Sequence, residues 1–167
     1  MRQMNREYFT VLFDYNYWAR DRLLAVCSDL SEQDFGRENG FTNGSIRGII
    51  THCLDAEYGW RCRFEGQARK DVLTEADLAS PALLRERWQQ EEASMRAYLA
   101  SLTDDVLRGD LAWQDAQGNE RRLPRLWLSL AHLVNHSTQH RSEAAEALTM
   151  IGRSPGDLDL GEYARQL

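Results

Sequence analysis

The sequence of 167 residues contains few cysteines, few prolines and no long hydrophobic run. Its three cysteines, Cys27, Cys53 and Cys62, are odd in number and form no C-x-x-C pair, so we expect reduced, mostly buried thiols rather than a disulfide framework. With only three prolines, few positions interrupt a helix, and long helices are allowed. The longest apolar stretches, such as "LWLSLA", are far shorter than a membrane span.

Positive charge is also scarce. The chain has 20 lysines and arginines against 26 acidic residues, a net charge of -6 and a pI near 5.2. We therefore expect neither nucleic acid nor a membrane among its partners. The N-terminal stretch "MRQMNREYF" lacks the apolar run of a signal peptide, which predicts a soluble, cytoplasmic protein. Length and a hydrophobic content of 43% indicate one domain spanning residues 1–167.

Four stretches carry apolar residues at steps of three and four, which is the helical period. Ser45 and Ser80 are candidate N-caps, a proline follows Ser80, and Gly152 stands where the last stretch would end. Four amphipathic helices pack most economically as a four-helix bundle, an all-α fold. The predicted helices run from Asn5 to Leu30, from about Ile46 to Phe64, from Pro81 to about Ser101, and from Pro124 to Ile151.

Two of the connections between these helices are long. About 15 residues separate the first helix from the second and about 22 separate the third from the fourth, which permits crossover connections. In the longer one, "LAWQDAQGNERRL" has two short segments around Gly118 and Asn119, which indicates a small hairpin or an irregular crossover. The tail "SPGDLDLGEYARQL" is predicted to be a turn plus a short docking segment.

Histidine is rare, yet three of the four histidines fall within nine residues of the last predicted helix. On a wheel of about 100° per residue, His136 lies at the edge of the apolar stripe and His140 inside it, whereas His132 lies outside. His52 lies at the edge of the stripe of the second helix. Two helices thus present imidazoles at the margin of the core, where one side stays open to solvent.

The spacing makes His136 and His140 a chelating pair. Side chains four residues apart have Cβ atoms roughly 5–6 Å apart, so both imidazoles can reach one ion. His132 and His140 are separated by a rise of roughly 12 Å, so a third ligand must come from elsewhere, and His52 is the remaining histidine. The pair alone also fits two satisfied boundary histidines. Since "HSTQH" lacks the glutamate of "HExxH", a metalloprotease is excluded.

Four longer motifs are spread along the chain from near the N-terminus to the C-terminal tail: "LFDYNYWARDRLL", "GIITHCLDAEYGW", "HLVNHSTQHRSEAAEAL" and "GRSPGDLDLGEYARQ". Together they resemble the DinB family within the DinB/YfiT-like metalloenzymes. The resemblance implies an up-down-down-up four-helix bundle that binds nickel, zinc or another divalent ion. Residue by residue, it implies His52, His136 and His140 as ligands. His132 matches a position that is often histidine in relatives without being a ligand.

The sequence departs from the family pattern after the last ligand. Many relatives read "HRGQ" there, whereas here Ser142 and Glu143 follow Arg141. Glu143 lies near the ligand face of the wheel, so it could orient an imidazole, join the metal or act as a catalytic base. A partly solvated glutamate at the bundle margin is the alternative. Asp55, one turn after His52, is a candidate partner for that imidazole or simply an exposed charge.

Three imidazoles leave coordination positions open, as in catalytic metal sites. An ion there can activate water for hydrolysis or ionise a thiol for S-transfer. Characterised relatives are thiol-dependent transferases and isomerases that use low-molecular-weight thiols such as bacillithiol or mycothiol. The resemblance therefore implies one divalent ion per chain and a thiol S-transferase acting on small electrophiles. A metal-dependent hydrolase and a non-catalytic metal-binding stress protein are the alternatives.

The resemblance also implies a homodimer, since family members are often dimers through the outer faces of the bundle. Trp127, Val134 and Ala145 fall beyond the core stripe of the last helix and are candidates for a second apolar contact. For Trp127, packing under a loop is the alternative. Cys53 directly follows His52, so its side chain points about 100° away into the apolar stripe, and we expect no role for it as a ligand.

Overall fold

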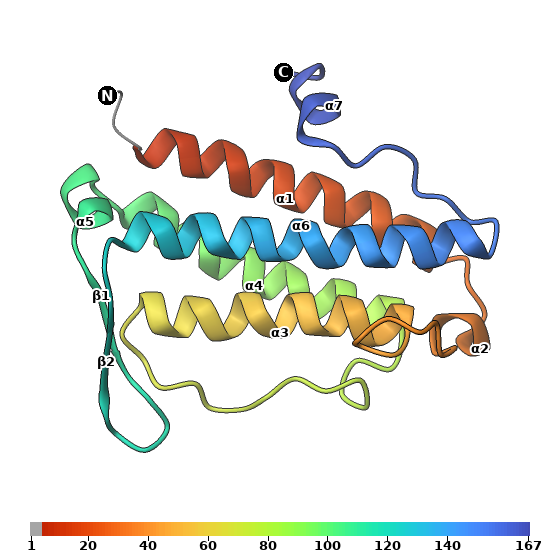
Figure 1. Cartoon of the computed structure of the whole chain (residues 1–167), viewed down its shortest axis with the longest axis horizontal. Coiled ribbons are helices and arrows are strands. Elements are labelled where there is room, and N and C mark those ends of the chain that lie inside the picture. Colours follow the sequence, from red (N-terminus) through yellow and green to blue (C-terminus); the bar gives the residue numbers. More distant parts are fainter. Residues whose placement is uncertain (1–4) are drawn as a thin grey trace.

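The computed structural model describes residues 5–167, so part of the N-terminal stretch that argued against a signal peptide lies outside it. Four long helices lie side by side, and the chain runs one way along the first and last and the other way along the middle two (Figure 1). The expectation of a mostly helical chain is confirmed. The long helices are α1 (Arg6–Cys27), α3 (Ile46–Phe64), α4 (Pro81–Ser101) and α6 (Leu126–Met150).

Short elements connect the long helices. Of the two alternatives for residues 111–123, the structure has the hairpin: two antiparallel strands pair Leu111 with Leu123 and Gln114 with Glu120. No helix within residues 5–167 is long and apolar enough to cross a membrane. The short elements are α2 (Glu32–Phe35), α5 (Asp104–Arg108), β1 (Leu111–Gln114), β2 (Glu120–Leu123) and α7 (Leu160–Ala164).

The two middle helices have the bounds that the sequence predicted. Ser45 accepts a hydrogen bond from the Gly48 backbone N–H, and Ser80 accepts one from the Leu83 N–H. Each serine satisfies a donor that a helix start would otherwise leave without a partner. These local hydrogen bonds are why the starts of α3 and α4 could be placed from sequence.

The first and last helices are shorter than predicted. The Ser28 N–H makes the last α-helical bond, and the next N–H groups bond to carbonyls only three residues back, as the Leu30 N–H does to Cys27. The helix α1 therefore ends at Cys27. At the start of the last helix, Pro124 lies outside the helix, because Arg125 after it has a φ of 60°, outside the helical region. The helix α6 therefore begins at Leu126.

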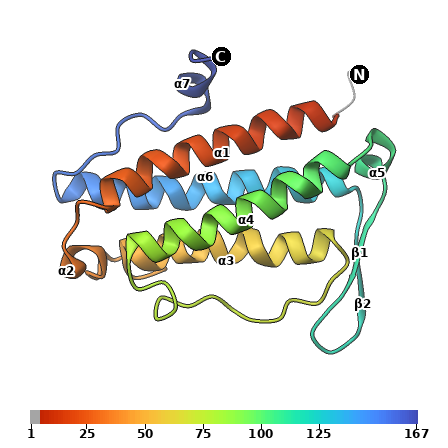
Figure 2. The same cartoon turned by 180° about the vertical axis from the view of Figure 1, so that it is seen from behind.

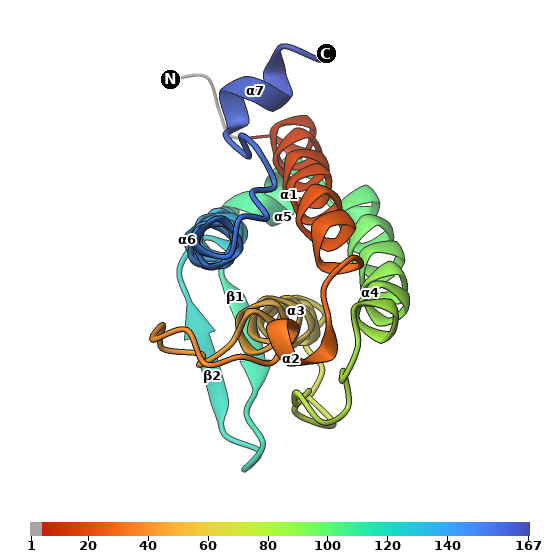
Figure 3. The same cartoon turned by 90° about the vertical axis from the view of Figure 1, so that its right-hand side faces the viewer.

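Two clusters of buried side chains fill the bundle, one toward each end. Figure 2, the view from behind, shows α4 running obliquely between α1 and α3, which it contacts. Figure 3 shows the four long helices around a common centre. The cluster near α2 includes Leu24, Ile49, Leu54, Leu84 and Leu148. The cluster near the hairpin includes Phe9, Phe13, Met95, Leu130 and Leu133.

A polar layer separates these clusters, with the carboxylate of Glu57 fully buried at its centre. The Tyr17 hydroxyl donates to Glu57 Oε1 at 2.7 Å, and Trp88 Nε1 donates to Oε2 at 3.1 Å. The guanidinium of Arg20 lies 4.8 Å from the centroid of the Tyr17 ring and 5.5 Å from that of Trp88. This group ties α1, α3 and α4 together by directional contacts.

The helix α6 joins the polar layer through Arg141. Its guanidinium is buried, donates to Asn16 Oδ1 of α1 and lies 5.4 Å from the centroid of the Tyr15 ring. The C-terminal tail contacts α1, because the Tyr15 hydroxyl donates to the Leu158 carbonyl at 3.0 Å. Tyr163 of α7 packs on the Tyr15 ring at 6.0 Å between centroids.

The prediction that Val134 lies on an outer face is wrong. Val134 is 6% exposed and belongs to the cluster near the hairpin, and Trp127 packs against that cluster partly buried. The prediction assumed one buried stripe on α6. The helix contacts α1, α3 and α5, so a wider arc of its surface is buried than one stripe provides.

The buried carboxylate predicts a dependence of stability on pH. Burial raises the pKa of Glu57 from 4.5 to about 7, since the charged form is poorly solvated there. The folded protein then keeps a proton that the unfolded chain releases, so this contribution to stability is complete below pH 4.5 and is lost as pH rises through 7. Over that range we expect Glu57 alone to contribute a loss of about 3 kcal/mol of unfolding free energy in the metal-free protein. The lowered pKa values of His52 and His136 act in the opposite direction.

Denaturant unfolding of the metal-free protein between pH 4.5 and 8 measures this loss as the difference between wild type and Glu57→Gln, because both proteins share the contribution of the histidines. Glu57→Gln can still hydrogen-bond to both Tyr17 and Trp88, so it should fold and lack this component of the pH dependence. Glu86→Gln, at an exposed glutamate of α4, is the matched control and should follow the wild type. Parallel pH profiles for Glu57→Gln and wild type would contradict the prediction.

Candidate metal centre

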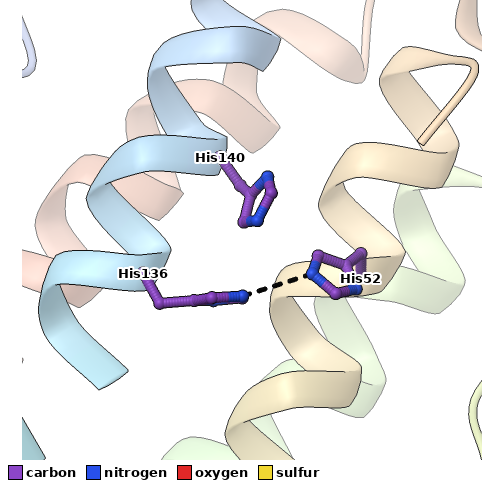
Figure 4. A group of neighbouring side chains, drawn as sticks. All are labelled: His52, His136 and His140. Atoms are coloured by element: carbon purple, nitrogen blue, oxygen red, sulfur yellow. Dashed lines mark hydrogen bonds between the residues drawn. The ribbon is translucent and has the colours of Figure 1, made fainter. Parts of the chain in front are cut away.

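Three histidines meet at the seam between α3 and α6 (Figure 4). His52 comes from the middle of α3, and His136 and His140 are one turn apart on α6. One ligand nitrogen from each residue lies within 4.8 Å of the other two. The ring centroid of His140 is 4.6 Å from that of His52 and 4.5 Å from that of His136. The structure thus brings together the three ligands that the sequence predicted.

The spacing of these nitrogens fits a shared ion. The Nε2 atoms of His52 and His136 are 3.3 Å apart. Two nitrogens bound to one tetrahedral ion at about 2.0–2.1 Å stand about 3.3 Å from each other. A divalent ion could therefore bind between α3 and α6 with small adjustments of the imidazole rings.

The surroundings of His52 and His136 favour the neutral form of their imidazoles. Burial, followed by repulsion from the other histidines, lowers the pKa of His136 to about 4. Burial and the neighbouring His140 also lower the pKa of His52. Neutral imidazole is the form that binds metal, because its unprotonated nitrogen carries the lone pair. His52 and His136 are half-buried, which leaves one side of the cluster open to solvent.

Glu143 contacts one of the candidate ligands. Its Oε2 lies 2.7 Å from Nδ1 of His140, and both side chains are largely buried. A carboxylate in this position accepts a hydrogen bond from Nδ1–H, which favours the tautomer in which Nε2 of His140 carries no proton and can bind an ion. Of the three roles that the sequence left open for Glu143, this hydrogen bond fits the first, orienting an imidazole.

Asp55 and His132 lie outside the cluster. Asp55 accepts hydrogen bonds from the side chain of Arg69 and from the Leu73 backbone N–H at 2.7 Å, so it secures the connection after α3. His132 is exposed, and its ring centroid is 5.8 Å from that of His136 and 5.1 Å from that of Trp60. His132 is therefore not among the three histidines that the structure groups, in agreement with the expectation that it is not a ligand.

The cysteines are free and buried, as expected. Cys53 lies in the core cluster near α2, and burial raises the pKa of its thiol to about 12. Burial also raises the pKa of Cys27 to about 12. Among the residues that the structure describes, no cysteine joins the histidine cluster, so its candidate ligands are three imidazoles.

Two buried polar residues, Glu57 and Arg141, were not predicted from the sequence. Glu57 and Arg141 are charged side chains at inward-facing helix positions, and both are buried. Their positions on the helical wheels were the available signal, because a charge beside an apolar stripe requires a partner. Their partners Tyr17 and Asn16 are 40 and 125 residues away, so spacing alone could not identify them.

The fold and the site together define a class: a helical bundle with three histidines grouped at one seam between helices. The sequence pattern of the DinB family matches residues 1–166. The chain is 26% identical over 157 residues to Protein DinB of Bacillus subtilis (strain 168), covering 91% of each protein. The chain therefore belongs to the DinB family.

A solved structure supports the same fold. A DinB-like protein from Bacillus cereus ATCC 10987 matches with a TM-score of 0.69 at 14% sequence identity. The match covers 94% of this chain and 99% of that one. At this level of identity the likeness concerns the arrangement of the helices.

The three-histidine geometry predicts which residues are required for metal binding. His52→Ala, His136→Ala and His140→Ala should each weaken binding of nickel or zinc by more than about 100-fold, since loss of a ligand should exceed the 10–100-fold effect of a supporting residue. Titration calorimetry measures the affinity, and circular dichroism checks that the helices remain. His132→Ala is the matched control and should change affinity only a few-fold. Retained binding after His140→Ala, or equal loss after His132→Ala, would contradict the assignment.

The contact between Glu143 and His140 predicts a graded effect. Glu143→Gln keeps an acceptor but loses the charge, whereas Glu143→Ala loses both, so metal affinity should fall about tenfold in the first and up to about 100-fold in the second. Glu146→Gln, at an exposed glutamate one turn later, is the control. Unchanged affinity in both Glu143 variants would show that the carboxylate does not support the ligand.

Proposed function

We propose that this DinB family protein binds one divalent ion, nickel or zinc, through His52, His136 and His140 and acts as a thiol S-transferase on small electrophiles. The observation that carries the proposal is the convergence of three imidazole nitrogens within 4.8 Å. Imidazoles are neutral, so a ligand set of three leaves the double positive charge of an ion unbalanced. An open position there favours an anionic ligand, and a thiolate is such a ligand.

The sulfur would come from outside the chain. Cys53 is buried in the core and keeps its proton, so a low-molecular-weight thiol is the cosubstrate that we propose. When bound, the ion supplies the positive charge that lowers the pKa of this thiol. The thiol loses its proton, its sulfur forms a bond to the electrophilic carbon, and the leaving group departs with its bonding electrons.

The residues around the cluster have separate tasks in this proposal. Glu143 holds the His140 ring so that Nε2 faces the ion, and it is the candidate catalytic residue that accepts the proton of the thiol. The half-buried sides of His52 and His136 leave an approach for the small-molecule substrate. A hydrolase is the second candidate, because the same carboxylate could accept a proton from water.

We also propose that residues 1–167 form a single DinB-like domain with up-down-down-up connectivity. The helix directions in Figure 1 support this connectivity. A cytoplasmic location is supported by the three free cysteines, which suit a reducing compartment. For a homodimer, Trp127 and Ala145 remain candidate contacts, since both are partly accessible on α6.

The transferase proposal predicts a spectroscopic signal. Adding 2-mercaptoethanol to the cobalt- or nickel-loaded protein should produce a sulfur-to-metal charge-transfer band, because the ion favours the deprotonated sulfur. His52→Ala should remove both the ion and the band. Cys53→Ser is the control and should retain both, because this side chain is in the core.

Other outcomes favour the other candidates. If thiols leave the spectrum unchanged while activated esters or amides are hydrolysed in a metal-dependent way, the hydrolase is supported. If neither response occurs and the bound ion resists exchange, the protein is a non-catalytic metal-binding stress protein. Either result would contradict the transferase proposal.

A further inference from the structure

An apolar pocket of about 350 Å³ adjoins the histidine cluster on the side of the hairpin. Its lining is almost entirely apolar and comes from three separate elements. It consists of Trp60 from α3, Leu123 and Pro124 from the end of β2 onward, and Leu128, Ser129 and His132 from α6. The pocket volume lies within the range of small-molecule sites, roughly 300–1,000 Å³.

His132 lies between the pocket and the histidine cluster. His132 lines the pocket, and its ring centroid is 5.1 Å from that of Trp60 and 5.8 Å from that of His136. His132 and His136 are one helical turn apart, which is a rise of about 6 Å. A molecule that places one end in the pocket can therefore extend its other end to the candidate metal position.

The pocket is open to solvent, and Arg63 packs on one of its walls. Leu128 is 45% exposed and Leu123 is 37% exposed, so two large apolar side chains are left in contact with water. The guanidinium of Arg63 lies 4.9 Å from the centroid of the Trp60 ring and supports that ring as a wall. Contiguous exposed apolar surface beside a candidate catalytic site is typical of a ligand-binding region.

We propose that this pocket binds an apolar group of the substrate, so that the electrophile carries an aryl or alkyl group at least about 6 Å from its reacting atom. The inference rests on the proposed function, because the histidine cluster defines where the reaction takes place. In this arrangement Leu128, Trp60 and His132 determine specificity, while the histidine ligands select for the reacting group.

Thiols with an apolar end test whether a molecule with one end at the ion can place an apolar group in the pocket, and they stand in for the electrophile because their sulfur can be followed at the ion. The probes are ω-phenylalkanethiols from phenylmethanethiol to 4-phenylbutane-1-thiol, with 2-mercaptoethanol as the reference. Their affinities for the nickel- or cobalt-loaded protein are measured from the charge-transfer band. We expect the longest phenyl thiols to bind about tenfold more tightly than 2-mercaptoethanol or better, because burial of the phenyl group favours binding.

A matched pair of variants locates the effect. Leu128→Ser should weaken binding of the longer phenyl thiols several-fold and leave 2-mercaptoethanol unchanged, since Leu128 lines the pocket and is not one of the candidate ligands. Leu83→Ser is the control, because Leu83 on α4 has the same 45% exposure and lies outside the pocket. Equal affinities for phenyl thiols and 2-mercaptoethanol, or an unaltered series in Leu128→Ser, would overturn the pocket proposal and leave the proposed function intact.

An alcohol separates the pocket from the thiol chemistry. The probe 4-phenylbutan-1-ol has no sulfur, and its binding is followed by tryptophan fluorescence, since Trp60 lines the pocket. If every thiol fails to give a band, the proposed function fails, while alcohol binding that weakens in Leu128→Ser still supports the pocket. Absence of alcohol binding, or a change of oligomeric mass in Leu128→Ser by light scattering, would overturn the proposal. The second result would assign the pocket to a contact between two copies.

Discussion

A carboxylate in the centre of the bundle determines how α3 is turned against its neighbours. Removing the Glu57 carboxyl group from water is unfavourable, and the fold compensates through hydrogen bonds from Tyr17 and Trp88 to both of its oxygens. These contacts are directional, whereas apolar contacts tolerate rotation of a helix. His52 lies five residues before Glu57, about 140° around the helix, and therefore faces α6 instead of the interior.

The same constraint acts on α6 through Arg141. Arg141 directly follows His140 in the sequence, and its guanidinium is held in the interior by Asn16 and the ring of Tyr15. Because adjacent residues are about 100° apart, anchoring Arg141 toward α1 turns His140 toward α3. The two polar anchors thus place imidazoles from both helices at one seam. The candidate metal centre depends on a polar layer that contains none of its ligands.

The parts of the structure that were predictable depend on local patterns. Serine caps placed the starts of α3 and α4, and the spacing of His136 and His140 identified their shared face. The parts that were not predictable depend on distant partners. Val134 is buried because α6 is covered by several elements, and Asp55 binds the following connection because Arg69 folds back onto it.

The arrangement separates two kinds of selection in the proposed function. A ligand set of neutral imidazoles favours an anionic reacting group, whatever the rest of the substrate is. The apolar pocket distinguishes substrates by what they carry at a distance, and its wall at Leu123 and Pro124 belongs to the end of the hairpin. Connections vary more readily than helices that hold a polar layer. Changes at the hairpin could therefore alter which electrophile binds while the polar layer keeps the histidines in place.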